Sequence, residues 1–323
     1  STRKESSAAS DVYKRQSLLL GGGDRLHALT DEMTGEHGAR GKSQKTHVPI
    51  STVSRDVNHR GVQIGPPRRR VSSRLSSMCG RYAASGHRDQ LVEVFGIDEV
   101  VDDCSLEDPR AWTRPRWNIA PTDHVPAVLE RASTAGHTRK LVGLRWGLVP
   151  SWSKDPRQGA RMINARLETV AEKPSFRKPL RARRCLLPAD GYYEWYAGTD
   201  GGPKQPFFIR PADQGLMVMA GIYEFWRDPD RVSDDPSAWI SSCSLITTRA
   251  SDDLGHIHDR MPVQVPVENW DAWLDPDLTD AQTALGLVHI PSPHQMVAHA
   301  VSRRVNKVGN EGPELVEPLP MEE

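Results

Sequence analysis

Met78 and Cys79 have the most distinctive chemistry in this sequence. A small residue such as cysteine after an initiator methionine favours removal of that methionine, which would leave Cys79 with a free α-amine beside its thiol. The amine has a reference pKa of about 7.7–8.0 and the thiol one of about 8.5, so modest shifts make both nucleophilic near neutral pH. Such a 1,2-aminothiol attacks an aldehyde through nitrogen, giving an imine, and then closes a thiazolidine through sulfur. On these two residues alone, an ordinary buried cysteine after an internal methionine is the competing interpretation.

Five further motifs contain polar residues, and four of the five also contain aromatic residues or proline. They are Trp117–Thr122, Trp146–Trp152, Ile163–Thr169, Gly191–Trp195 and His258–Pro262. With these motifs the sequence from Met78 to about Pro318 resembles the SRAP family, the SOS response-associated peptidases, whose members crosslink to abasic sites. Val301–Val308 resembles the closing segment of the family.

The resemblance implies that Cys79, exposed as the N-terminal residue, captures abasic sites in single-stranded DNA as a thiazolidine crosslink that protects the lesion. It also implies self-processing by a peptidase activity and reversal of the crosslink. No metal or cofactor is implied by the sequence. Removal of Met78 and of anything preceding it is then a requirement.

Glu194, His258 and Asn164 are the expected partners of Cys79 in catalysis. Partial desolvation of Glu194 between two aromatic residues would raise its pKa toward the range of proton transfer, although an outward-facing strand glutamate fits the sequence as well. The family motif selects His258 over the nearby His256 and implies that it acts on the sugar oxygen, opening the abasic ring. For Asn164, which is otherwise a turn asparagine, the motif implies positioning of a hydroxyl or phosphate.

Arginines and tryptophans within the motifs are the expected DNA contacts. The set is Arg81, Asn118, Trp152, Arg166, Trp195 and Arg260. Guanidinium groups suit phosphate oxygens, and aromatic stacking contributes about 1–3 kcal/mol per base without sequence preference. Asn118 is either a turn former or, by resemblance, a residue that shapes the Cys79 pocket. Ser153 stands where some family members carry a second tryptophan, so one stacking contact is missing.

Two other function classes fit parts of the sequence. The Met-Cys-Gly opening also occurs in amidotransferases that hydrolyse glutamine with an N-terminal cysteine. Alternatively, the arginines and tryptophans alone could form a non-catalytic module that binds single-stranded DNA with Cys79 buried. Glutamine hydrolysis identifies the first class, and equal affinity for intact and abasic strands identifies the second.

Charge and composition divide the chain at Met78. Of its 42 basic and 42 acidic residues, 14 and 7 precede Met78, leaving 28 and 35 after it. We expect residues 1–77, rich in Ser, Gly and Arg, to be a disordered basic extension upstream of the true start, or else a DNA-tethering arm. The resemblance implies an SRAP domain over residues 78–318, with 319–323 as a C-terminal tail. Since that domain is acidic, any DNA site must be a local basic cleft.

The elements that must position these residues are mostly strands. One helix is predicted over His87–Phe95 and two more at Val267–Leu274 and Thr279–Val288. Strands are predicted at Val125–Leu129, Leu141–Leu148, Arg184–Leu187, Tyr192–Tyr196, Pro206–Arg210, Leu216–Phe225, Cys243–Thr247 and Met296–Val301. Many strands with few helices between them predict an α+β domain with a curved, mostly antiparallel, barrel-like core and peripheral helices.

Cellular context follows from what the sequence lacks. No apolar run approaches the roughly eighteen residues of a membrane span, and Ser17–Leu20 is too short for a signal peptide. The four cysteines are scattered without metal-type spacing. We expect a soluble, cytoplasmic, nucleoid-associated monomer with reduced thiols.

Overall fold

The computed structural model describes residues 80–103, 106, 108–133, 136–198, 201–231, 235–250 and 254–320. The expectations for residues 1–77 and for Met78 and Cys79 concern residues outside this set. Among the residues that the structure describes, no helix combines the length and the apolar character that crossing a bilayer requires.

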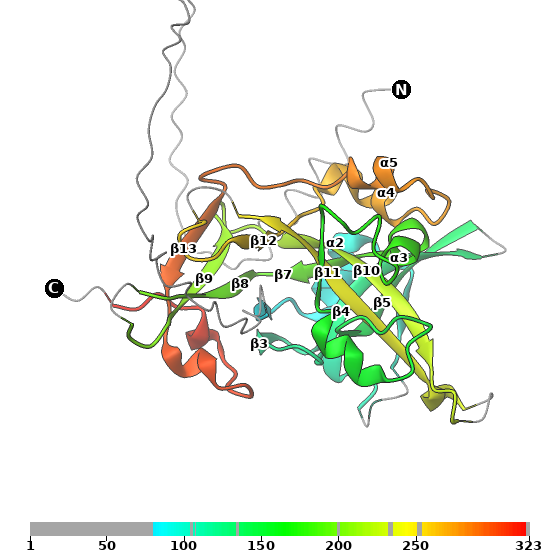
Figure 1. The fold of residues 1–323 in the computed structure, drawn as a ribbon, viewed down its shortest axis with the longest axis horizontal. Coiled ribbons are helices and arrows are strands. Elements are labelled where there is room, and N and C mark those ends of the chain that lie inside the picture. The colour runs from blue at the N-terminus through cyan, green and yellow to red at the C-terminus, as the bar shows by residue number, and fades with distance from the viewer. Residues whose placement is uncertain are drawn as a thin grey trace, which may run out of the picture. The chain divides into compact units, whose positions relative to one another are not determined.

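Five strands close into a barrel (Figure 1). They are β4 (His124–Ser133), β5 (Gly136–Trp146), β7 (Arg184–Ala189), β10 (Met217–Arg227) and β11 (Trp239–Arg249). Neighbours in the order β5-β4-β7-β10-β11 run antiparallel. The ring closes where β11 pairs with β5 in parallel. One parallel pair is unavoidable, because an odd number of strands in a ring cannot alternate in direction throughout.

Alternate residues of each barrel strand face opposite sides, as strand geometry requires. Interior residues include Ala127 on β4, Cys185 on β7, Tyr223 on β10 and Leu245 on β11, all buried in one cluster. The interior is narrow at Gly221, where an added Cβ would lie 2.7 Å from Leu187 and 2.8 Å from the Cys185 sulfur. Only glycine fits there without displacing its neighbours.

Residues on the outer barrel face bury a second cluster under the helices. Val128, Leu186, Ala220 and Ile246 contribute to it from four strands. Helices α2 (Arg88–Phe95), α3 (Arg177–Ala182), α4 (Trp270–Leu274) and α5 (Ala281–Leu285) supply the other side. Figure 1 shows α4 and α5 together beside the barrel, in orange.

A second sheet carries the residues nearest the start of the described chain. Its strand order is β13-β9-β8-β1-β3. The bounds are β13 (Met296–Ala300), β9 (Gln205–Pro211), β8 (Gly191–Tyr196), β1 (Tyr82–Ala84) and β3 (Arg116–Ile119). Tyr82 is fully buried, and its ring packs edge-on against Trp146 of β5 at 5.2 Å. This contact packs β1 against the barrel strand β5.

Three short strands complete the barrel sheet. β2 (Glu99–Val101) pairs with β5, whereas β6 (Asn164–Arg166) and β12 (Arg260–Pro262) both pair with β11. Short 3-10 helices lie at Ala111–Thr113, Pro156–Arg161, Pro236–Ala238, Val267–Asn269, Arg303–Asn306 and Pro313–Leu315.

The α+β class with a mostly antiparallel barrel core is confirmed. Each of the eight predicted strand runs overlaps an observed strand, and the helix predicted at His87 is α2. The helix predicted at Thr279–Val288 is shorter in the structure and runs from Ala281 to Leu285. The side chain of Asp280 caps its N-terminus by accepting from the Thr283 N–H. At Val267–Leu274 a 3-10 turn precedes α4.

Candidate active site

Glu194 and His258 meet in a buried setting. Glu194 alternates along β8 with Tyr193 and so shares the side of Tyr192, which packs into the barrel-side cluster. Glu194 is 2% exposed, and its Oε1 lies 3.9 Å from Nδ1 of His258. The interpretation of Glu194 as an outward-facing strand residue is therefore wrong.

His258 lies in the turn before β12. Its side chain is 13% exposed, and this burial lowers the pKa of His258, with the nearby Asp259 carboxylate acting in the opposite direction. The Arg260 backbone N–H donates to Nδ1 over 3.2 Å. A buried carboxylate beside a histidine is the kind of arrangement that general acid-base catalysis uses.

β11 joins the motif of Asn164 to the motif of His258. On one side, Asn164 and Arg166 of β6 pair with Leu245 and Thr247 of β11. On the other, β12 pairs with the same end of β11, where Thr247 faces Pro262 and Arg249 faces Arg260. Asn164 is half-buried and Arg166 is exposed. Two motifs far apart in the sequence thus flank one strand end.

Arg260 is buried beneath this strand end. Its two terminal nitrogens bind the Glu168 carboxylate at 2.7 and 3.0 Å, and Nη2 also donates to the Thr247 carbonyl at 2.6 Å. The arginine lowers the pKa of Glu168 to about 2. Arg260 was expected to contact DNA, but a phosphate contact would require its guanidinium to leave Glu168. In this structure it ties β12 to the segment after β6.

One group of contacts joins Arg81 and Trp195 to the C-terminal segment, residues 301–310. The Arg81 guanidinium lies 5.6 Å from the Trp195 ring centroid and donates to the Val305 carbonyl at 2.9 Å. Trp195 Nε1 donates to Oδ1 of Asn306 at 2.7 Å. Asn306 belongs to the segment recognised from the sequence, but no pattern there marked it as a contact of the site.

Asn118 does not face solvent. The residue is fully buried, its Oδ1 accepts from Arg81 at 2.7 Å, and its Nδ2 donates to the carbonyls of Val305, Lys307 and Asn310. In this structure its amide therefore binds protein groups, and its assignment as a DNA contact stays a prediction. The buried amide holds Arg81 and the C-terminal segment together.

Trp152 is exposed but belongs to another part of the molecule. The side chain is in a loop after β5, and its residue is 61% exposed. The carbonyl of the next residue, Ser153, accepts from Trp226 Nε1 at 2.7 Å. Trp226 pairs with Ile240, near the start of β11, whereas the His258 motif pairs near its end. The structure therefore does not bring Trp152 into the Glu194 and His258 group.

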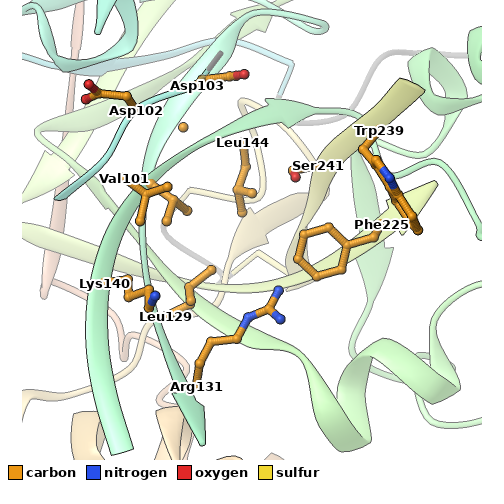
Figure 2. A pocket seen from close by; sticks show the side chains of 12 residues that line it. Val101, Asp102, Asp103, Leu129, Arg131, Lys140, Leu144, Phe225, Trp239 and Ser241 are labelled. Carbon is orange, nitrogen blue, oxygen red and sulfur yellow. The ribbon is translucent and has the colours of Figure 1, made fainter. Parts of the chain in front are cut away.

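A cavity of about 310 Å³ opens at the other end of the barrel (Figure 2). Trp239 and Phe225 line it, and the Arg131 guanidinium lies 4.5 Å from the Phe225 ring centroid. Because β11 rises about 3.3 Å per residue, its Trp239 end is roughly 30 Å from its Arg249 end. The cavity is thus distinct from the candidate active site.

His137, Asp275 and Asp277 form a histidine-carboxylate group. The ligand atoms of His137, Asp275 and Asp277 lie within 4.8 Å of one another. His137 Nε2 is 3.4 Å from the Asp277 carboxylate, whose side chain is 81% exposed. An ordinary surface ion pair accounts for this group.

Comparison with known proteins gives concordant matches. Residues 78–308 match the family model described as SOS response associated peptidase (SRAP). Abasic site processing protein YoqW of Bacillus subtilis (strain 168) is 38% identical over 240 residues, covering 74% of this chain and 99% of that protein. Abasic site processing protein HMCES of Gallus gallus is 34% identical over 281 residues, with coverages of 75% and 78%. A crystal structure of a protein from Bacteroides thetaiotaomicron superimposes with a TM-score of 0.59 at 25% identity, covering 75% of this chain and all of that one.

Proposed function

Because this chain belongs to the SOS response associated peptidase (SRAP) family, we propose that it processes abasic sites in DNA and captures them covalently through Cys79. Several of its relatives are named abasic site processing proteins. The proposed substrate is an abasic site in single-stranded DNA. The proposed product is a thiazolidine crosslink.

The register between β1 and β8 is the observation that carries the proposal. Tyr82 faces Tyr192, and the Arg81 carbonyl accepts from the Tyr193 N–H. Continued one residue further, this antiparallel register would place Gly80 opposite Glu194. Cys79 lies outside the described residues, but its Cα is only about 3.8 Å from that of Gly80 along the chain. This supports delivery of Cys79 to the Glu194 and His258 pair.

The reaction needs two nucleophiles and groups that accept and donate protons. Ring opening of the abasic deoxyribose moves a proton from the C1′ hydroxyl and delivers one to the ring oxygen, exposing the aldehyde. The Cys79 amine adds to that carbonyl carbon, and loss of water gives an imine. The thiol then adds to the imine carbon, its proton passes to nitrogen, and the thiazolidine closes. Atoms balance with the release of one water.

His258 and Glu194 divide the proton transfers in this scheme. His258 serves the sugar oxygen, and Glu194 serves the amine and the departing water. Asn164, on the strand end beside them, would hold a sugar hydroxyl or the adjacent phosphate through its amide. The same groups, acting in reverse, allow slow release of the crosslink.

DNA contact would come from exposed and half-exposed groups around this strand end. Arg166 is exposed, and Arg81 and Trp195 are partly exposed. Trp152 provides a separate, strongly exposed ring for stacking on an unpaired base. Arg260 remains a candidate phosphate contact only if DNA displaces Glu168 from it.

Generation of the nucleophile is part of the proposal. Met78 and any residues ahead of it must be removed before Cys79 has a free amine. Removal of Met78 alone is ordinary initiator processing, and a longer extension would require cleavage at the Met78–Cys79 bond. Self-cleavage at that bond would account for a peptidase activity.

A denaturing-gel assay tests the proposed function. Protein whose translation starts at Met78 is incubated with matched single-stranded oligonucleotides that contain or lack one abasic site. We expect a band that survives denaturation with the abasic strand alone, and Glu194→Gln slows its formation by about 100-fold or more. The control Glu93→Gln changes an exposed glutamate on α2 and leaves the rate unchanged.

Two results would contradict the proposal and indicate another function. Equal affinity for both strands without a covalent band would indicate a non-catalytic strand-binding module. Glutamine hydrolysis that depends on Cys79, again without a band, would indicate an amidotransferase.

A further inference from the structure

The Arg260 backbone N–H defines the tautomer of His258. It donates to Nδ1 over 3.2 Å, and a ring nitrogen that accepts a hydrogen bond carries no proton. The neutral imidazole then has its proton on Nε2. This choice matters, because only the protonated nitrogen of a neutral histidine can donate to a sugar oxygen.

Two carboxylates favour the opposite tautomer. Asp259 Oδ1 lies 3.2 Å from Nδ1 of His258, and Glu194 Oε1 lies 3.9 Å from it. Either oxygen would attract a proton placed on Nδ1. The side chain of Asp259 is 83% exposed, so water screens its effect, whereas that of Glu194 is 2% exposed. The Arg260 N–H must stay in place for the Nε2–H form to prevail.

Side-chain contacts hold that N–H in place. The Arg260 guanidinium binds both oxygens of Glu168 and the Thr247 carbonyl, and the residue is 7% exposed. Thr248 adds a 3.3 Å hydrogen bond to Glu168. Because Arg260 begins β12 two residues after His258, movement of its side chain would move the N–H that faces the imidazole.

We propose that Glu168 is a positioning residue for His258: by holding Arg260, it keeps the Arg260 N–H on Nδ1 and the imidazole proton on Nε2. The tautomer is a property of the free protein. Its consequence for crosslinking rests on the proposed function, in which His258 serves the sugar oxygen; the Nε2–H would do so by donating a hydrogen bond to the ring oxygen of the abasic sugar.

Nitrogen-15 NMR of the DNA-free protein tests the tautomer directly. In histidine-labelled protein at about pH 7.5, two-bond correlations distinguish Nε2–H from Nδ1–H. We expect the Nε2–H pattern for His258 in the wild type and a mixture or the Nδ1–H pattern in Glu168→Gln. The matched control is Glu172→Gln, an exposed glutamate in the turn after β6, which should leave the pattern unchanged.

Glu168→Asp is the second variant, for use if the glutamine variant does not fold. It keeps the charge but shortens the reach to Arg260, so an intermediate change is expected. The proposal is overturned if the wild type shows Nδ1–H, or if folded Glu168 variants keep the wild-type pattern.

A single-turnover crosslinking rate measured on the same samples connects the tautomer to function. We expect Glu168→Gln to lower it on the order of tenfold, within the range of acid-base contributions. An unchanged rate despite an altered tautomer overturns the functional part of the inference. Failure of the wild type to crosslink at all would instead overturn the proposed function, while the tautomer result would stand.

Discussion

Glu194 Oε1 lies 3.9 Å from Nδ1 of His258, and both side chains are largely shielded from water. The glutamate comes from β8 of the second sheet and the histidine from the turn before the barrel-sheet strand β12. The pair therefore forms only when the two sheets pack together. The candidate pair thus depends on the fold as a whole.

Trp152 should contribute to strand binding without contributing to stability. Replacing it with alanine is expected to weaken binding to an intact single strand by about 1–3 kcal/mol, or about 5- to 150-fold in Kd. Fluorescence anisotropy measures this. The control is Trp239→Ala at the barrel mouth, whose residue is 46% exposed. An equal loss in both variants would show that Trp152 has no specific role.

Asn118 should be intolerant even of an isosteric change. Asn118→Asp presents a carboxylate to three carbonyl oxygens now bound by Nδ2, so we expect a larger loss of stability than for Asn118→Ala. The alanine variant should lose about 1–3 kcal/mol for its unsatisfied buried partners. Urea unfolding measures both. Hydrogen exchange should rise first around residues 305–310, and uniform exchange would contradict the assigned role.

His258 should stay neutral to lower pH than an ordinary histidine. Burial lowers its pKa below 6.5, and the groups around it are Asp259, Glu194, Lys204 and Arg260. An NMR titration should place its midpoint below 6.5. Asp259→Asn removes a charge that raises this pKa, so the midpoint should fall further. An upward shift would contradict the assignment.

Glu168 should make stability depend on acid pH. Its pKa of about 2 in the folded protein lies below the ordinary 4.5, so folding favours the carboxylate. That contribution is complete above about pH 4.5 and is lost as the pH falls toward 2. Urea unfolding from about pH 5 to pH 3 should therefore show a steeper decline for the wild type than for Glu168→Gln. Parallel declines would show that the ion pair contributes nothing.

Local patterns predict the long elements because those elements bury one face along their length. The helix at Leu91, Val94 and Phe95 and the strand at Val125–Leu129 are of this kind. The strands β1, β6 and β12 each have three residues and are defined by their partners. No periodicity can develop over so short a length, so the sequence does not reveal them.

Family motifs identify Glu194 and His258, whereas their contact depends on tertiary packing. Arg260 shows the limit of residue type as a guide. A guanidinium fits a phosphate and a carboxylate equally well, and only the fold shows that Glu168 lies within reach. The sequence likewise allows Asn118 to be a turn former, and only the fold shows that its side chain is buried against the C-terminal segment.

The central claim is covalent capture by Cys79, and intact mass spectrometry tests it most directly. The mass of protein whose translation starts at Met78 is measured before and after incubation with a single-stranded oligonucleotide that contains one abasic site. The Cys79→Ser variant is measured in the same way. We predict loss of Met78 and then an adduct equal to protein plus oligonucleotide minus one water. Imine and thiazolidine share that mass, so borohydride distinguishes them: a thiazolidine resists reduction, and an imine gains two hydrogens. Absence of the adduct from processed wild type, or an equally stable adduct in Cys79→Ser, would contradict the account.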